Sequence, residues 1–372
     1  MQHAEGEELM PLRFKSPVVV EPLRFTWFDV ELPDPGPYEA IFRNRACLVC
    51  GSDLHVYKGL HPFAPLPACC GHEVAADVWK VGEKVSTLRV GDRVYFSGAG
   101  ARATPCGQCF YCGRGDPGKC LNPHPAPSLK IGGKFVARFP SGFGEYTMGH
   151  EAVAYKIPDN VSYSDAAVIT DLAYVTGVIK RSGAGIGKSV VVIGAGPIGL
   201  RTLEVVKLTG ASPIIVCETV KYRLAKAREL GADEAVNPAE EDAVERVLQA
   251  TDGAGIDIVY DTTGNTAATN QGMSMLKKRI GGAGTLCLMG LFEQPNLTLD
   301  VSALMYKAGR IFAEWGLSEG PKSIEDSLSM LSRGKVRPSE WITHRFPEDR
   351  ADEAMNLLVA KRDNAIGVEI VR

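Results

Sequence analysis

Apolar and polar positions divide this chain of 372 residues into two parts with different patterns. Residues 1–150 hold short β-branched runs, such as 18–20 and 40–45, separated by many prolines and glycines. Such punctuation is typical of a strand-rich region with many loops. The pattern changes near Ser164, because the segment 164–181 reads as one helix capped by Ser164 or Asp165.

From residue 189 onwards, fully apolar strands alternate with helices. The expected strands lie at 189–194, 213–218, 255–264 and 283–291, and two expected helices lie at 197–211 and 221–232. Strands that are apolar on both faces and alternate with helices predict a parallel sheet covered on both sides. After Ala313 the pattern predicts two more helices and the short strand VEIVR. The expected class is α/β, with a doubly wound parallel sheet beside a β-rich domain.

Length and charge narrow the possible functions. A chain of 372 residues is long enough for two domains. Its net charge of −3 gives no reason to expect a nucleic acid or an anionic membrane as partner. No run of eighteen apolar residues occurs, and the first residues are acidic rather than basic and then apolar. We therefore expect a cytoplasmic protein that acts on a small molecule.

A glycine-rich turn joins the first apolar strand to the helix that follows it. The turn reads Gly194-Ala-Gly196-Pro-Ile-Gly199, so Pro197 and Ile198 occupy the start of the helix. In a dinucleotide fold the first glycine makes the tight turn, the second lets the backbone approach the pyrophosphate, and the third lets the helix pack on the strand. The helix N-terminus then offers free N–H groups to the phosphates. The context predicts a dinucleotide site.

The next strand ends in an acidic residue, Glu218, about twenty residues after the glycine turn, as such a site requires. A carboxylate there suits the ribose hydroxyls of NAD and repels the 2′-phosphate of NADP. NAD is therefore favoured. Arg223 lies close enough in sequence to leave NADP open, and Glu218 could also be a solvated loop carboxylate.

Eight of the ten cysteines fall between Cys47 and Cys120. Such clustering in a reducing compartment indicates metal rather than disulfides. Four of them form a loop with the spacing C-x2-C-x2-C-x7-C: Cys106, Cys109, Cys112 and Cys120. Four thiolates satisfy the tetrahedral preference of zinc and leave no open position, so this zinc is expected to be structural. The alternatives are four unrelated thiols or two redox-active disulfides.

Two short motifs, CGSDLH at 50–55 and GHE at 71–73, precede that loop. They bring one thiol, Cys50, and one imidazole, His72, which are two of the three protein ligands that a catalytic zinc usually takes. Either residue alone would more often belong to the core. The second motif, the four-cysteine loop and the nucleotide turn make a second, catalytic zinc the better interpretation.

These features together resemble the zinc-dependent medium-chain dehydrogenases, the superfamily of alcohol, polyol and threonine dehydrogenases. The matching features are CGSDLH, GHE, the four-cysteine loop, GFGEY at 142–146, GAGPIG and Glu218, in the family's order. The resemblance implies a GroES-like catalytic domain built from 1–172 and 312–372, with a structural zinc lobe at about 104–122. It implies a Rossmann domain inserted at 173–311, and a homodimer or homotetramer.

The resemblance also implies roles for residues of the first motif. Cys50 and His72 would be the first two ligands of the catalytic zinc. Asp53 would be the carboxylate that orients the zinc-bound histidine. Ser52 and His55 match the family's relay that carries a proton from the alcohol to solvent.

The third ligand departs from the family's pattern. In the family it often lies five residues before a glycine in the helix that leads into the Rossmann domain. That count from Gly177 gives Leu172, which cannot bind metal, whereas Asp171 is one position away. A branch of the family uses Asp as this ligand, so Asp171 is expected here. Glu73, which coordinates zinc in some members, or water could complete the site instead.

The implied reaction is hydride transfer between an alcohol and NAD. Zinc would act as a Lewis acid, as it does when it lowers the pKa of bound water to about 7. The stretch THRFP at 343–347 resembles the polyol, threonine and butanediol branches, and so favours a secondary, polyol-like alcohol. Residues expected near the substrate are Leu54, Tyr57, Leu291 and Trp315, although each could simply pack in the core.

Two other functions remain open from the sequence. A zinc-independent double-bond reductase of the same fold would need neither CGSDLH nor GHE. A zinc- and nucleotide-binding sensor without catalysis, or a structural protein, is left open by the unsettled third ligand. Loss of turnover on zinc removal would indicate the dehydrogenase, whereas unchanged NAD binding without turnover would indicate the sensor.

Overall fold

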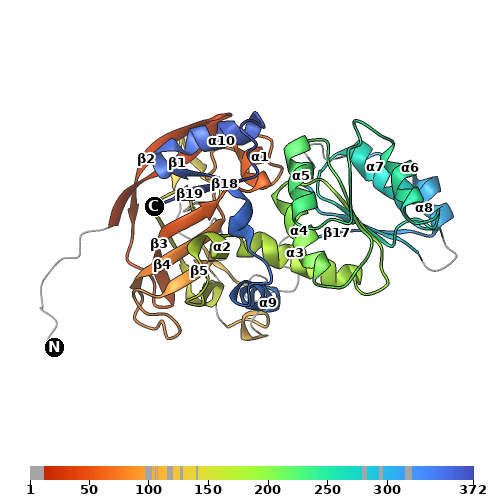
Figure 1. Ribbon diagram of the computed structural model, residues 1–372. Coiled ribbons are helices and arrows are strands. Elements are labelled where there is room, and N and C mark those ends of the chain that lie inside the picture. The colour runs from red at the N-terminus through yellow and green to blue at the C-terminus, as the bar shows by residue number, and fades with distance from the viewer. Residues whose placement is uncertain are drawn as a thin grey trace, which may run out of the picture.

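The computed structural model describes residues 12–96, 103–104, 106, 108–114, 120–125, 129–139, 141–278, 283–292, 296–314 and 321–372. Two large sheets lie side by side (Figure 1). One belongs to a strand-rich region that includes the C-terminus, and helices cover the other. Among the described residues, no helix combines the length and apolar character needed to cross a bilayer.

The first sheet joins segments from both ends of the chain. Its main path runs in the order β11 (Ala154–Lys156), β5 (Arg93–Phe96), β4 (Glu73–Val81), β3 (Glu39–Leu48), β19 (Gly367–Val371) and β18 (Ile342–Pro347), with β10 (Tyr146–His150) also paired to β3. The C-terminal strand β19 pairs antiparallel with β3, so the last residues complete a sheet begun by the first. A hairpin of β1 (Leu12–Glu21) and β2 (Arg24–Leu32) stands beside it.

The second sheet has six parallel strands. Their order is β14 (Glu234–Val236), β13 (Ile214–Cys217), β12 (Val190–Ile193), β15 (Ile258–Asp261), β16 (Thr285–Leu288) and β17 (Arg310–Ala313). By order along the chain this is 3-2-1-4-5-6, the arrangement of a dinucleotide-binding doubly wound sheet. Every residue of β12, β13 and β15 is buried, as their continuous apolar runs predict.

Helices and short elements surround both sheets. The helices are α1 (Gly51–Tyr57), α2 (Tyr163–Ala167), α3 (Ile169–Ser182), α4 (Pro197–Lys207), α5 (Lys221–Glu229), α6 (Ala243–Gln249), α7 (Thr266–Met275), α8 (Val301–Lys307), α9 (Pro321–Ser332) and α10 (Ala351–Val359). The 3-10 turns are η1 (Cys112–Arg114), η3 (Glu151–Val153), η4 (Pro338–Trp341) and η5 (Glu348–Arg350). Short strands pair β6 (Ala103–Thr104) with β7 (His124–Pro125), and β8 (Lys130–Ile131) with β9 (Lys134–Phe135).

The helix expected at 164–181 differs in its start and its continuity. Its cap is neither Ser164 nor Asp165 but Ser162, whose hydroxyl accepts a hydrogen bond from the backbone N–H of Asp165. The prediction of the cap was therefore wrong by two residues, because the first turn forms before the apolar periodicity begins. The helix is interrupted at Val168, and the chain continues as α3, which packs against α4 and α9. Helix α3 thereby links the two sheets (Figure 1).

The expected domain boundaries stay predictions. The boundary at 172/173 falls inside α3, and the one at 311/312 falls inside β17, which remains paired with β16 up to Ala313.

Candidate active site

The start of α1 places one sulfur and one carboxylate at the edge of the first sheet. Cys50 is the residue before the helix, and its backbone N–H donates to Asp53 Oδ2 over 3.1 Å. That bond satisfies one of the free N–H groups of a helix start. This hydrogen bond fixes the start of the helix, and with it the backbone position of Cys50.

Asp53 is fully buried, and a backbone N–H, a guanidinium and an imidazole surround its carboxylate. Its Oδ1 accepts from Gly71 N over 3.0 Å and from Arg138 Nη1 over 3.2 Å, and it lies 3.4 Å from His72 Nδ1. Burial alone would raise its pKa, but His72, Arg138 and the backbone donor together lower the pKa of Asp53 to about 2. The carboxylate is therefore ionised and faces the Nδ1 side of the His72 ring, as an orienting residue must.

Gly71 makes the turn that brings His72 beside Asp53. Its φ is +95°, and a Cβ there would lie 2.6 Å from a ring carbon of Phe143 and 2.9 Å from Cys47 Sγ. Only glycine fits both the conformation and the space. The GHE motif thus combines a turn with two ligand-type side chains.

Four side chains from three parts of the fold converge at this point. The ligand atoms of Cys50, His72, Glu73 and Asp171 all lie within 4.8 Å of one another. Cys50 Sγ is 3.7 Å from Asp171 Oδ2 and 3.8 Å from its Oδ1. All of them but His72, which is half-buried, are buried. The structure thus brings Asp171 into the cluster, while Leu172 packs in the core.

The electrostatics of this cluster fit a bound cation. Burial raises the pKa of the Cys50 thiol, and Asp171 and Glu73 raise it further. Burial and Asp171 likewise raise the pKa of Glu73, and both Glu73 oxygens are buried with no hydrogen-bond donor reaching them within the described part of the chain. Buried acceptors of this kind require a partner. A thiol, an imidazole and carboxylates form the donor set that zinc takes in open sites, so these residues fit the metal.

The expected relay residues lie on the same helix. Ser52 follows Cys50, and its hydroxyl oxygen is buried without a hydrogen bond to the described residues. His55 stands in the last turn of α1. Their part in moving a proton stays a prediction.

The glycine turn after β12 has the geometry of a dinucleotide site. Gly194 has φ +94°, and a Cβ on Gly199 would lie 1.9 Å from the carbonyl oxygen of Gly194. Beside Gly196 the nearest atom to an added Cβ is Arg223 Nη1, 3.9 Å away, so a ligand can approach this backbone. Helix α4 starts here, with Gly196 before it and Pro197 and Ile198 as its first residues.

Glu218 follows β13 and turns back onto this loop. Its Oε2 accepts from Ala195 N and its Oε1 from Val220 N, each over 2.8 Å. The carboxylate is buried and fixed beside the turn. Arg223 lies near Gly196, over the ring of Tyr222 at 5.8 Å. Both residues therefore lie where the sequence places them, and the choice between NAD and NADP stays a prediction.

The four-cysteine loop closes on itself. The sulfurs of Cys106, Cys109, Cys112 and Cys120 lie within 4.8 Å of one another, and all four are free thiols. Cys109 Sγ is 3.5 Å from Cys112 Sγ and 4.0 Å from Cys120 Sγ. The backbone N–H groups of Cys112 and Leu121 lower the pKa of Cys109 to about 6. This grouping fits a closed zinc site rather than disulfides.

Comparisons with known proteins give the family. The model of the alcohol dehydrogenase GroES-like domain matches residues 36–159, and that of the zinc-binding dehydrogenases matches 197–333. The chain is 31% identical to a sorbitol dehydrogenase of Halalkalibacterium halodurans, over 88% of this chain and 90% of that one. It is 32% identical to an L-threonine 3-dehydrogenase of Pyrococcus furiosus, over 91% and 93%. The chain belongs to the zinc-binding medium-chain dehydrogenases.

Solved structures agree on the fold of this dehydrogenase. An alcohol dehydrogenase from a Thermus species superposes with a TM-score of 0.79 at 27% identity, covering 96% of this chain and 99% of that one. A 2R,3R-butanediol dehydrogenase from Bacillus subtilis gives 0.80 at 25% identity, covering 96% and 99%. The expected fold, a Rossmann sheet with a GroES-like β-rich domain, is confirmed.

The sequence did not predict three residues that shape the site. Arg201, on α4, is fully buried and pairs with both Asp171 and Glu73. Arg138 donates to Asp53, and its Nη2 lies 3.4 Å from His61 Nε2. Burial and Arg138 lower the pKa of His61 to about 4, so this imidazole is neutral. None of the three belongs to a recognisable sequence motif. Each contacts partners that are distant in the sequence, so residue spacing gives no signal for it.

The residues expected near the substrate have mixed outcomes. The hydroxyl of Tyr57 donates to Leu23 O and contacts Asp352 Oδ1, each at 2.8 Å, so Tyr57 is a packing residue. Leu54 and Leu291 are half-buried, and Trp315 lies outside the described residues. In the THRFP stretch, Thr343 donates to Gly367 O within the first sheet.

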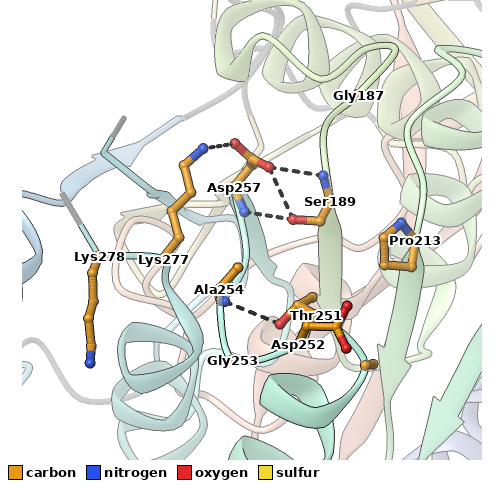
Figure 2. A pocket seen from close by; sticks show the side chains of 12 residues that line it. Gly187, Ser189, Pro213, Thr251, Asp252, Gly253, Ala254, Asp257, Lys277 and Lys278 are labelled. Carbon is orange, nitrogen blue, oxygen red and sulfur yellow. Dashed lines mark hydrogen bonds and ion pairs between the residues drawn. The ribbon is translucent and has the colours of Figure 1, made fainter. Parts of the chain in front are cut away.

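A surface cavity of about 540 Å³ lies elsewhere in this dehydrogenase. Its lining includes Ser189, Pro213 and Asp257, which precede β12, β13 and β15 (Figure 2). Lys277 is held there by Asp257. The cavity therefore opens at the N-terminal edge of the parallel sheet, opposite the glycine turn, and ligands of such sheets bind at the other edge.

Proposed function

We propose that this dehydrogenase transfers a hydride between a secondary, polyol-like alcohol and NAD at the cluster of Cys50, His72, Glu73 and Asp171. The single observation that carries the proposal is the convergence of these four side chains within 4.8 Å. Cys50, His72 and Asp171 would hold a catalytic zinc, and the four-cysteine loop a structural one. Glu73, the alternative to Asp171 as third ligand, lies in the same cluster.

When bound, the zinc supplies a Lewis acid for the substrate oxygen, and the nicotinamide supplies the hydride acceptor or donor. The chain's own residues position and deprotonate the alcohol. Asp53 keeps His72 in one orientation through Nδ1. Ser52 would accept the proton of the alcohol while it passes its own hydroxyl proton towards His55, which would release a proton to solvent. Carbonyl reduction uses the same groups in reverse.

On the nucleotide side, the backbone at Gly196 and the start of α4 would hold the pyrophosphate. Glu218 would bind the adenosine ribose, which favours NAD. The choice of a secondary alcohol is supported by relatives: the sorbitol and L-threonine 3-dehydrogenases and a D-arabitol-phosphate dehydrogenase of Enterococcus avium, which is 28% identical.

The two competing functions are less well supported. A zinc-independent reductase has no use for a buried cluster of thiol, imidazole and two carboxylates. The non-catalytic sensor depends on the absence of a third ligand, and the position of Asp171 beside Cys50 supports Asp171 as that ligand.

A panel of primary, secondary and polyhydroxylated alcohols with NAD and NADP tests the proposal. We expect reduced-cofactor absorbance to rise fastest with a secondary alcohol and NAD. No absorbance change with any alcohol, alongside intact NADH binding, would favour the sensor.

We also propose a homodimer or homotetramer in the cytoplasm. Strand β17 ends the six-strand order, and helix α8 before it exposes Val301, Met305 and Tyr306. An open strand edge beside exposed apolar side chains suits a second copy of the chain. Light scattering should give two or four times the 40.0 kDa of one chain, and a monomer would contradict this.

A further inference from the structure

Arg201 is a charged side chain with no access to solvent. It stands on α4, the helix that starts at the glycine turn. Its Nη1 contacts Asp171 Oδ2, its Nη2 lies 3.5 Å from Glu73 Oε2, and its guanidinium lies 5.0 Å from the ring centre of Trp341. Burial of a charge costs folding free energy unless the charge is paired, so the two carboxylates are what make the buried guanidinium tolerable.

The two partners of Arg201 are both members of the metal cluster. Asp171 Oδ2 is paired with the guanidinium, and the two oxygens lie at similar distances from Cys50 Sγ, 3.7 Å for Oδ2 and 3.8 Å for Oδ1, so Oδ1 is the oxygen that remains for a metal. A ligand carboxylate is commonly fixed in this way, with one oxygen on the metal and the other held by a partner. Arg201 therefore holds one oxygen of Asp171 in place, in the same way that Asp53 orients the ring of His72.

Glu73 has a different relation to the same guanidinium. Its oxygens accept no hydrogen bond from the described residues, and Arg201 is the cation paired with it there. Two carboxylates thus share one positive charge. With a divalent metal and the Cys50 thiolate, the charges of metal, thiolate, two carboxylates and guanidinium cancel.

We propose that Arg201 is a positioning residue that fixes Asp171 as the third metal ligand and holds Glu73 back from the metal. This inference rests on the catalytic zinc of the proposed function. Three protein ligands leave a fourth position for the substrate oxygen, whereas four protein ligands make a closed, structural type of site. If the guanidinium is removed, the metal becomes the cation nearest to Glu73. The Glu73 carboxylate then occupies the fourth coordination position of the metal.

Cobalt(II) in place of zinc makes this coordination visible, since its absorption bands report the number and type of ligands. The wild type, Arg201→Met, Glu73→Gln and the double variant Arg201→Met/Glu73→Gln are loaded with cobalt and titrated with imidazole, which binds an open position. Lys207→Met is the matched control, because it removes an exposed positive charge from the same helix.

We expect imidazole to shift the cobalt bands of the wild type, Lys207→Met and Glu73→Gln alike. Arg201→Met should bind imidazole at least about tenfold more weakly, because Glu73 then competes for the fourth position; loss of a ligand's partner changes metal affinity or activity by a factor of this order. The double variant should recover the wild-type response, because Glu73 is then no longer a competing ligand.

Arg201→Met with the imidazole affinity of the wild type would overturn the inference. So would a changed cobalt spectrum in Glu73→Gln, which also covers the case in which Arg201→Met fails to fold. If the wild type itself holds one cobalt per chain and gives no response, the proposed catalytic metal site is at fault instead.

Discussion

Single residues at the active site are placed by charge and backbone geometry together. Asp53 is ionised in the interior because Arg138, His72 and a backbone N–H offset its burial. Gly71 puts His72 beside it, since no larger residue fits that turn. The proposed ligand His72 therefore depends for its position on Asp53 and Gly71, which are not themselves proposed as ligands.

The first prediction concerns the thiol of Cys50, a proposed metal ligand. Cys50→Ala should lower turnover at least about a thousandfold, or by about 4 kcal/mol, because the Lewis acid contributes several kcal/mol. NADH binding, measured by fluorescence, should persist because the glycine turn lies in the other sheet. Cys69→Ala is the control, since that buried thiol lies outside the cluster. Full activity of Cys50→Ala would refute the catalytic assignment.

The second prediction concerns cofactor choice. Glu218→Gln removes the charge that repels a 2′-phosphate. We expect the ratio of kcat/KM for NAD over NADP to fall about tenfold, with turnover on NAD retained. Steady-state kinetics with both cofactors measure this ratio. A wild type that prefers NADP would show that Arg223, beside Gly196, governs the site instead.

At the scale of elements, apolar periodicity predicted the parallel strands and their helices well, because strands buried on both faces leave a continuous pattern. It did not predict the start of a helix that a capping hydrogen bond determines, as at Ser162, which caps the short helix α2 ahead of α3. The motifs predicted the cysteine loop and the glycine turn. Arg201 could not be predicted, because a polar residue on an amphipathic helix is expected at the surface.

The third prediction concerns the four-cysteine loop. Cys112→Ser should lower the zinc content from two atoms per chain to one, because a closed site needs all four thiolates. The segment 106–120 should then be cut faster by proteases, since bound metal supplies its folding free energy. Cys217→Ala, a buried thiol in β13, serves as control. An unchanged zinc content would contradict the structural site.

At the scale of the whole molecule, the active site joins parts that the chain keeps far apart. Cys50 precedes α1 and His72 precedes β4 of the first sheet, whereas Asp171 lies on α3 between the sheets. Arg201 lies on α4, the helix of the glycine turn. Trp341 Nε1 also donates to Glu204 Oε2 on that helix, over 3.2 Å. The proposed metal and dinucleotide sites are therefore connected through α3 and α4.

In the proposed mechanism, zinc and a nicotinamide dinucleotide together carry hydride transfer to or from an alcohol. The most direct test is to strip the catalytic metal with a chelator, assay alcohol-dependent NAD reduction, and add zinc back. We predict that turnover disappears with the metal, that NADH binding remains, and that one zinc per chain restores activity. Turnover that survives complete loss of metal from the Cys50 cluster would contradict the account.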